Sequence, residues 1–481
     1  MRKGSVGVNR LRLAALGAAA LVLTGCGSGS VNPPINPAIS DASAQENWAL
    51  TGSEFDETVI GLAFSGGGMR ASAFSHGVLS ALDQQMLNGR NGPRPMTETI
   101  DFLAGVSGGS IPAAYFGLHG RAGLANFPER FLYKDAEQGF DTRVSISNAL
   151  KILGDGGVND NSRFPKWLDE NVFGGATYAD LFKRRKPIVW ISASDIYNRV
   201  PFTFEPLTFN AICSDLSRTR ISEAVAASAA VPGVFSPLNV ENFGNTCNSR
   251  MPGWMTRAIN DRTAPAMQRA SALAMQRIRS NPEQFRYLKL LDGGLTDNYG
   301  VQPLTVMREN RTRGHVPLTE EQGARIRRML FLVIDSGRGP AGDWTRSLAS
   351  PSAFDLAGAV TDAAIDAGSY KGFDSFAAVM NEWQEELRKW RCTLSSSQVA
   401  RLRGSASGWN CRDVKFFVGR VTFDDVGADR ARLDAVPTRF KLDQGTVDLL
   451  ISSGASALQN NPTWREFHRS LGGRPATIAA R

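Results

Sequence analysis

Short apolar runs that alternate with helical patterns are the feature that most constrains the fold of this chain. Runs of five to seven mainly apolar residues are typical of buried strands, and strands that alternate with helices are typical of a mostly parallel sheet. The runs span residues 59–64, 100–106, 188–192, 287–291 and 329–334, and helical patterns follow at 71–86, 109–118 and 300–309. We therefore predict a three-layer α/β fold, with helices on both faces of a central sheet.

The first 26 residues form a separate segment with the pattern of an export signal. Basic residues precede an apolar stretch from Leu13 to Leu23, which is too short to span a bilayer but suits the core of a signal peptide. The stretch ends in Leu23-Thr24-Gly25-Cys26, which resembles a bacterial lipoprotein box. That resemblance implies a signal peptide over 1–25, a lipid on Cys26, and a protein anchored to a membrane of the bacterial cell envelope, on the periplasmic side or at the cell surface. The alternative is an ordinary signal peptide with an incidental cysteine.

Three further regions follow the signal segment. Residues 26–55 are rich in Gly, Ser, Pro and Asn, and we interpret them as a flexible tether. We predict a catalytic domain over 56–340 and, after a Gly/Pro-rich break, a C-terminal extension over 341–481 that packs on the same domain. In that extension Phe376, Met380, Trp383, Leu387 and Trp390 share one helical face, and a strand is predicted over 415–423. An aromatic stripe of this kind indicates core packing.

The charge of the chain suits a lipid surface better than a nucleic acid. The formal net charge is +8, and the segment before Cys26 holds four basic residues and no acidic one, so the chain from Cys26 onward carries 8 − 4 = +4. Mild basicity favours contact with anionic head groups. No stripe dense in Lys and Arg is present, and we therefore predict no nucleic-acid partner.

Four cysteines remain after Cys26. An even number in an exported protein indicates two disulfides, and four cysteines allow three connectivities. The shortest loops come from pairing the cysteines in chain order, as Cys213–Cys247 and Cys392–Cys411. Four buried free thiols remain the alternative.

Three glycine-containing stretches that carry chemistry each follow a predicted strand. The first contains Gly66-Gly67-Gly68 and then Arg70, where consecutive backbone amides ahead of a helix can stabilise an oxyanion. Taken alone, this stretch also fits a dinucleotide-binding loop. The second, Gly105-Val106-Ser107-Gly108-Gly109, fits the G-x-S-x-G pattern of a nucleophile elbow. The third, Asp292-Gly293-Gly294, presents a carboxylate on a tight turn, although a plain turn or a calcium loop would look the same.

The positions of the histidines distinguish a catalytic triad from a serine–aspartate pair. A catalytic triad needs a histidine placed beside the serine. The four histidines are His76, His119, His315 and His468, and none lies in a loop after a predicted strand with Gly, Asp or Ser as neighbours. A pair of Ser107 with Asp292 therefore explains the sequence better than a triad.

Together these stretches resemble the patatin-like phospholipases. The glycine loop, the Ser107 elbow and the Asp292 turn occur in that order, and the stretch Ala227-Ser228-Ala229-Ala230-Val231-Pro232 resembles the family's Ser/Pro block. The resemblance covers about residues 58–300, and 437–440 extend it. It implies that Ser107 is the nucleophile, Asp292 the base, and Gly66, Gly67 and Gly68 the oxyanion loop, with no cofactor and no metal. This chain departs from the family pattern at Ala71 and in the inserted segment 240–284.

The resemblance implies a lipid acyl ester hydrolase, of phospholipase A or lysophospholipase type. Arg70 then either meets a substrate phosphate or forms a structural ion pair, which we favour. In the insertion, a basic helical pattern over 262–282 together with Trp254 suggests a lid for anionic lipid, although a docked surface helix is the better interpretation. Two other functions stay open: a non-catalytic envelope lipoprotein that binds lipids or a partner, and a dinucleotide-dependent enzyme. The exact lipid, the positional preference and the oligomeric state are not fixed by the sequence.

Overall fold

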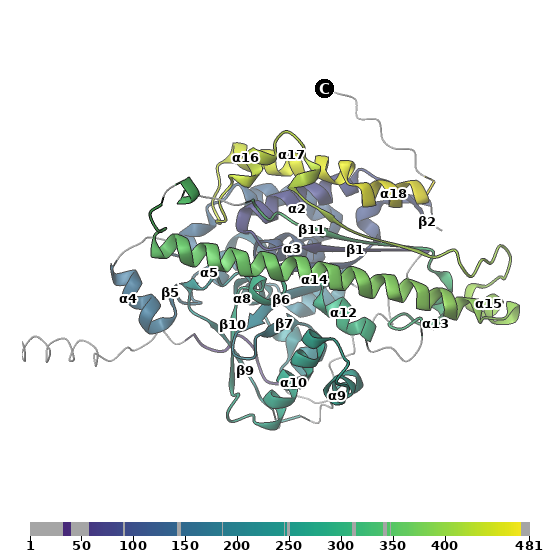
Figure 1. Cartoon of the computed structure of the whole chain (residues 1–481), viewed down its shortest axis with the longest axis horizontal. Coiled ribbons are helices and arrows are strands. Elements are labelled where there is room, and N and C mark those ends of the chain that lie inside the picture. The colour runs from purple at the N-terminus through teal and green to yellow at the C-terminus, as the bar shows by residue number, and fades with distance from the viewer. Residues whose placement is uncertain are drawn as a thin grey trace, which may run out of the picture.

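The computed structural model describes residues 32–39 and 57–472, apart from 90–91, 142–145, 185, 245, 248–250, 310–313, 340–343 and 347. Cys26 and the predicted signal peptide lie outside the described residues. A central sheet of eight strands is covered by helices on both faces (Figure 1). No helix among the described residues combines the length and the apolar character needed to cross a bilayer.

The sheet is mostly parallel, so the predicted three-layer α/β fold is confirmed. Five parallel strands lie side by side in the order β12 (Lys415–Val421), β11 (Arg328–Ile334), β1 (Thr58–Phe64), β4 (Ile100–Val106) and β6 (Ile188–Asp195). Three more strands join by antiparallel pairing: β10 (Tyr287–Leu291) and β7 (Val200–Phe204) each pair with β6, and β9 (Leu238–Glu241) pairs with β10. Every residue of β1 and of β4 is buried, which explains why their sequences are mainly apolar without alternation; the exception in β4, Asp101, pairs with Lys186.

Alternate residues of each strand point into two different cores. Ile60, Leu62 and Phe64 of β1 pack under α2 (Gly68–Asp83), α3 (Ser110–His119), α8 (Ile221–Ser228) and α17 (Gln444–Asn460). Val59 and Ala63 point to the opposite face, which α12 (Gln302–Glu309) and the long α14 (Ala353–Cys392) cover. The predicted apolar face of α14 is buried there.

Shorter elements connect these layers. The remaining helices with α geometry are α4 (Ile146–Asp155), α5 (Phe164–Leu168), α6 (Tyr178–Lys183), α7 (Pro206–Ala211), α9 (Gly253–Asn260), α10 (Ala266–Ser280), α11 (Gly294–Asp297), α13 (Glu320–Arg325), α15 (Ser396–Arg403), α16 (Arg430–Asp434) and α18 (Pro462–Ser470). Two small sheets pair β2 (Met86–Gly89) with β3 (Gly92–Pro95), and β5 (Gly157–Asn159) with β8 (Gly233–Phe235). Disulfides join Cys213 to Cys247 and Cys392 to Cys411.

Part of the predicted tether is packed on the folded body, which corrects the prediction for residues 32–39. Pro34 bridges to Asn239, and Ile35 is buried in the main core. Asn32 donates to the Pro237 carbonyl at 3.0 Å, and Asn36 donates to the Ser214 hydroxyl at 2.8 Å. Asn and Pro were interpreted as signs of a flexible chain, but here the amide side chains hold the segment to distant backbone.

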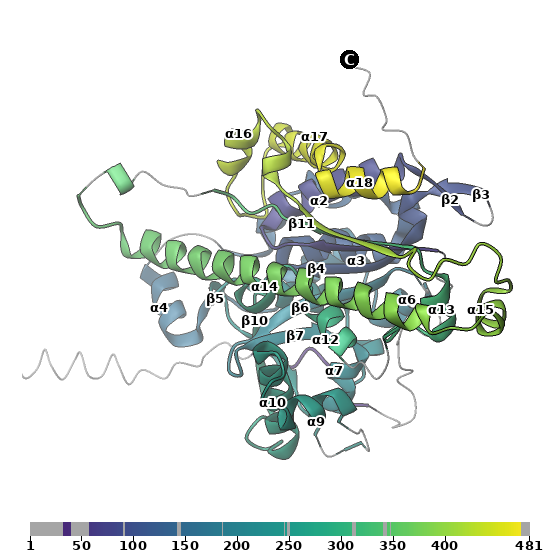
Figure 2. The same cartoon turned by 45° about the vertical axis from the view of Figure 1, so that its right-hand side comes forward.

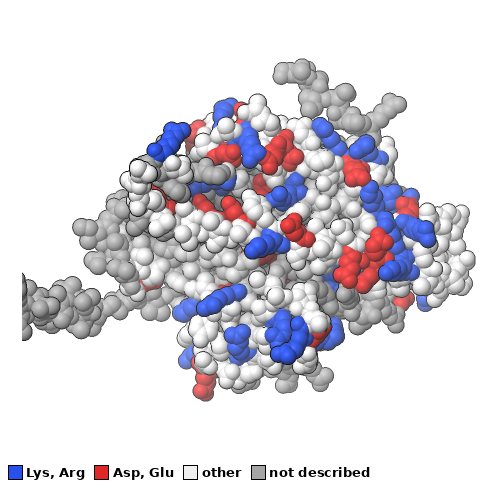
Figure 3. Space-filling model, in the orientation of Figure 1, with Lys and Arg blue, Asp and Glu red and all other residues white. Residues whose placement is uncertain are grey.

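The inserted segment forms a small lobe of its own. Trp254 of α9 is 4% exposed and packs with Met255, Ala272 and Met275, so it is not available to a lipid surface as the lid hypothesis required. The buried face of α10 includes Ala272, Ala274 and Ile278, while Met267 is exposed. Basic side chains gather on the surface of this lobe (Figure 3). The lobe therefore has the docked, basic helix that we favoured over a lid.

Candidate active site

The site lies where three loops meet, after β1, β4 and β10. The Ser107 hydroxyl donates a hydrogen bond of 2.7 Å to Oδ2 of Asp292. The other carboxyl oxygen of Asp292 accepts the Gly294 amide at 2.8 Å. Ser107 is 5% exposed and Asp292 is 7% exposed, so the pair is largely shielded from water. The two residues singled out by their motifs are thus in direct contact.

Ser107 occupies a strained turn between β4 and α3. Its φ of +50° is unusual for a residue with a side chain, and its amide donates to the Ser228 hydroxyl at 2.8 Å. Ser228 in turn donates to the Ser192 carbonyl at 2.6 Å, which ties the elbow to the end of β6. Gly108 leaves room for the glycine loop, because a Cβ there would collide with the Gly68 carbonyl. These contacts hold the hydroxyl towards Asp292.

Asp292 is fixed by backbone contacts on both sides. Its amide donates to the Ala230 carbonyl at 2.8 Å, and its own carbonyl accepts the Ser194 hydroxyl at 2.8 Å. Burial raises the pKa of the Asp292 carboxyl to about 6, although the hydrogen bonds from Ser107 and Gly294 act in the opposite direction. A carboxylate with a raised pKa is a better proton acceptor than an aspartate in water.

The glycine loop offers two backbone amides rather than three. Gly67 and Gly68 have φ values of +140° and +60°, and their amides donate to no group in the described part of the chain. The Gly66 amide is engaged, because it donates to Oδ1 of Asn298 at 3.0 Å. The prediction that Gly66 is an oxyanion donor is therefore wrong. Gly67 and Gly68 remain as candidate donors.

Arg70 has a structural position, as favoured from the sequence, although its partners are carbonyls and not a carboxylate. It is buried and donates to the Ser336 carbonyl at 2.8 Å and to the Val436 carbonyl at 2.7 Å. Burial lowers the pKa of its guanidinium to about 10, which leaves it charged at neutral pH. Both bonds tie the first turn of α2 to loops after β11 and α16, so Arg70 supports the glycine loop from behind.

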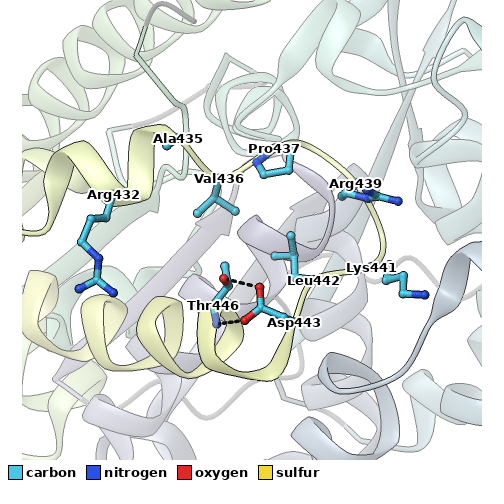
Figure 4. Close-up of a pocket in the computed structure, with 9 residues that line it drawn as sticks. All are labelled: Arg432, Ala435, Val436, Pro437, Arg439, Lys441, Leu442, Asp443 and Thr446. Atoms are coloured by element: carbon cyan, nitrogen blue, oxygen red, sulfur yellow. Dashed lines mark hydrogen bonds between the residues drawn. The ribbon is translucent and has the colours of Figure 1, made fainter.

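A cavity of about 520 Å³ lies beside the glycine loop, between α16 and α17 (Figure 4). Its lining residues are Arg432, Ala435, Val436, Pro437, Arg439, Lys441, Leu442, Asp443 and Thr446. The cations Arg432, Arg439 and Lys441 pair with Asp429, Glu137 and Asp135. Its link to the site is through backbone, because the Arg439 carbonyl accepts the Met69 amide at 2.8 Å. Ser107 and Asp292 do not line this cavity.

The four histidines lie against aromatic rings and not against the serine. His76 packs on Phe127, His119 on Tyr115, His315 on Trp390 and His468 on Trp464. Burial lowers the pKa of His76 to about 4, so this residue on α2 is neutral. One carboxyl oxygen of Asp292 accepts a hydrogen bond from the Ser107 hydroxyl, and the other accepts one from the Gly294 amide. The described residues also contain no group of three His, Cys, Asp or Glu side chains placed to hold a metal ion.

The family model for patatin-like phospholipases matches residues 62–305. The chain belongs to the patatin-like phospholipase family. The matched range contains the glycine loop, Ser107, Ser228 and Asp292, and it stops before the C-terminal extension. Membership of this family supports lipid hydrolysis as the function.

The other comparisons add little to the family match. No curated protein matches this patatin-like chain. Among solved structures, human GIVD cytosolic phospholipase A2 is similar at 15% identity and a TM-score of 0.29, over 57% of this chain and 45% of that one. The match thus spans less than half of the length of the human enzyme.

Two residues of this patatin-like site had no role assigned from the sequence. Ser228 holds the Ser107 amide, and Asn298 occupies the Gly66 amide. Ser228 stands in the Ser/Pro block, whereas Asn298 lies six residues after Asp292 and outside the three glycine-containing stretches. Their roles depend on contacts across more than 100 residues of sequence, which motif spacing does not reveal.

Proposed function

We propose that this chain is a lipid acyl ester hydrolase, of phospholipase A or lysophospholipase type, that works through a Ser107–Asp292 dyad. Its membership of the patatin-like phospholipases supports a lipid substrate. The observation that carries the dyad is the 2.7 Å hydrogen bond from the Ser107 hydroxyl to a buried carboxyl group. Nucleophile and base within hydrogen-bonding reach are what covalent acyl transfer requires.

In the first half of the proposed reaction, the Ser107 oxygen attacks the carbonyl carbon of the ester, and its proton passes to Asp292. The negative charge that develops on the carbonyl oxygen is stabilised by the free amides of Gly67 and Gly68. The C–O bond to the alcohol portion then breaks, and the leaving oxygen takes the proton from Asp292. An acyl-serine and a free alcohol or lysolipid result.

In the second half, water replaces the alcohol. Asp292 accepts a proton from the water as its oxygen attacks the acyl carbon, and the same two amides stabilise the second oxyanion. The bond to the Ser107 oxygen breaks, the proton returns to that oxygen, and a fatty acid leaves. Asp292 therefore acts as base and then as acid in each half, and no group outside the dyad and the loop is required.

Replacement of either dyad residue tests this proposal. Ser107→Ala and Asp292→Asn should each lower kcat for a soluble p-nitrophenyl ester by at least about 1000-fold, because nucleophile and base act as a unit. A fluorophosphonate should label the parent at Ser107 and leave Ser107→Ala unlabelled. His76→Ala is the control and should keep its activity. Full activity in either dyad variant, or loss of activity in His76→Ala, would reject the dyad.

We also propose that the enzyme is a lipoprotein of the bacterial envelope, anchored through Cys26. The lipoprotein-like box supports this location. Labelled palmitate fed to cells should enter the parent protein and not a Cys26→Ser variant, and fractionation should find the parent in the membrane. Equal incorporation in both proteins would reject the anchor. A panel of phospholipids, lysophospholipids and glycerides, with Ser107→Ala as the blank, would then identify the substrate.

A further inference from the structure

The two halves of α14 have very different surroundings. In the C-terminal half, Phe376, Met380, Trp383 and Leu387 are buried against the sheet. Arg391 donates to five backbone carbonyls, and Cys392 is bonded to Cys411. In the N-terminal half, most of the residues whose side chains the structure describes are exposed, and one contact with the body joins Asp362 to Arg338 at 3.2 Å. The helix is thus firmly held at one end and largely exposed at the other.

The exposed half presents an uncharged stripe to solvent. Leu356, Val360, Ala363, Ala367 and Tyr370 follow one another at intervals of four and three residues, which places them on one helical face. All five are exposed, with Leu356 at 53%, Val360 at 61% and Tyr370 at 54%. The three acids of this half, Asp355, Asp362 and Asp366, lie on another side of the helix.

This half projects beyond the edge of the sheet that carries the catalytic residues. Trp383 packs on Phe416 near the start of β12, whereas Tyr370 lies under Arg420 near its end. The helix therefore runs antiparallel to the strands, and its residues before Tyr370 continue past their carboxyl ends. Figures 1 and 2 both show this end of α14 extending past the strands, and its surface is mostly uncharged in Figure 3.

The N-terminal segment meets the body at the same edge. Asn32 donates to the Pro237 carbonyl, and the next residue, Leu238, pairs with Leu290 two residues before Asp292. Five residues separate Asn32 from Cys26, and the six steps from one position to the other reach at most about 22 Å in a fully extended chain. A lipid on Cys26 would therefore hold this edge of the molecule close to the bilayer.

We propose that the stripe from Leu356 to Tyr370 is a membrane-docking surface that seats the catalytic edge on a phospholipid bilayer. The inference rests on the proposed lipid-hydrolase function, which requires the substrate to reach Ser107 from a lipid surface. The stripe covers about 21 Å of helix, at 1.5 Å per residue, which is shorter than the hydrocarbon core of about 30 Å, so it would enter one leaflet and not cross the bilayer. Tyr370 at its end is a residue type common at the boundary between lipid and water.

The charges of this helix specify the kind of bilayer. The exposed half carries three acids and no base before Lys371, so anionic head groups would not attract it. Docking through apolar side chains should occur on zwitterionic phosphatidylcholine vesicles and should change little between low and high salt. A surface made by the basic α9–α10 lobe would instead need anionic lipid and would weaken in salt.

Vesicle binding by matched variants tests the proposal. The protein is the chain from residue 26 onward with Cys26→Ser, which has no acyl anchor, and it carries Ser107→Ala so that the vesicles stay intact. Adding Leu356→Gln and Val360→Gln should lower the fraction that pellets with phosphatidylcholine vesicles by at least about tenfold in partition coefficient. The control is Met86→Gln with Met267→Gln, two exposed methionines on other elements, and it should bind as the parent does.

Activity is measured separately, with Ser107 restored. The Leu356→Gln/Val360→Gln protein should hydrolyse a soluble p-nitrophenyl ester within about twofold of the parent, because neither residue touches the dyad. Unchanged vesicle binding in this variant, or an equal loss in the methionine control, would overturn the proposal. The proposal would also be overturned if the parent were a dimer and the variant a monomer that still binds vesicles. A parent that hydrolyses no ester would reject the enzymatic function, while the pelleting result would still decide the docking surface.

Discussion

At the scale of single residues, the Asp292 carboxyl controls when the dyad can act. Its pKa is raised to about 6 by burial, and the proposed base must be unprotonated to accept the Ser107 proton. We therefore expect kcat/KM for a soluble ester to fall tenfold per pH unit below about pH 6 and to be flat above it. A pH–rate profile from pH 4 to 8 measures this. A limb near pH 4 would show that the titrating carboxyl keeps the pKa of an aspartate in water and that burial does not raise it.

Ser228 is the residue whose effect is least visible in sequence. Ser228→Ala would leave the buried Ser107 amide without its acceptor, which typically costs about 1–3 kcal/mol, and would loosen the elbow. We expect a fall of about 10- to 100-fold in kcat, with KM nearly unchanged and slower fluorophosphonate labelling. Ser222→Ala on the same helix is the control, because the buried Ser222 hydroxyl has no partner among the described residues. If Ser228→Ala and Ser222→Ala lowered kcat and the labelling rate equally, Ser228 would have no special role in positioning Ser107.

At the scale of elements, the contact of α2 with α17 links the C-terminal extension to the glycine loop. A Cβ on Gly454 would collide with the Phe74 carbonyl of α2. Gly454→Ala should therefore force the helices apart, destabilise the protein by about 1–3 kcal/mol and lower esterase activity. Gly445→Ala, near the start of α17, has no contact closer than 3.4 Å and should be neutral or slightly stabilising. Thermal melts and esterase assays compare the two variants, and equal Tm values would contradict the close contact.

Elements were predictable wherever one local pattern determined them. The strands β1, β4, β6, β10 and β11 were predicted from short, mainly apolar runs, and α14 was predicted in part from its spaced aromatic residues. The antiparallel direction of β10 was not predictable, because an apolar run carries no information on which way its neighbour runs. Residues 32–39 were missed for a related reason: their order depends on Asn32 and Asn36 reaching partners more than 170 residues away.

Within the site, too, features set by a local motif were predictable and features set by long-range contacts were not. Ser107 and Asp292 were found because each stands in a short motif after a strand. Strand direction does not explain their contact, because β10 is antiparallel to β6; Asp292 reaches Ser107 because Leu290 and Leu291 pair with Asp195 and Ser194 at the end of β6. The sequence did not reveal that the Gly66 amide is hydrogen-bonded while the Gly67 amide is free within the described part of the chain. The difference arises because Asn298, from a distant loop, accepts only the Gly66 amide. Local sequence therefore identifies which groups react, whereas long-range contacts decide which neighbouring groups are free to assist them.

At the scale of the whole molecule, the extension after residue 341 is part of one folding unit with the catalytic portion. β12 pairs with β11 along seven residues, α14 covers the second core, and α17 covers α2. A chain that ends at Arg338 would expose the β11 edge and both apolar faces at once, so it should be insoluble although it contains the whole family match. A chain that ends at Gly472 keeps every described element and should stay soluble and active. Soluble yield and esterase activity compare the two, and an active enzyme ending at Arg338 would show that the catalytic portion folds alone.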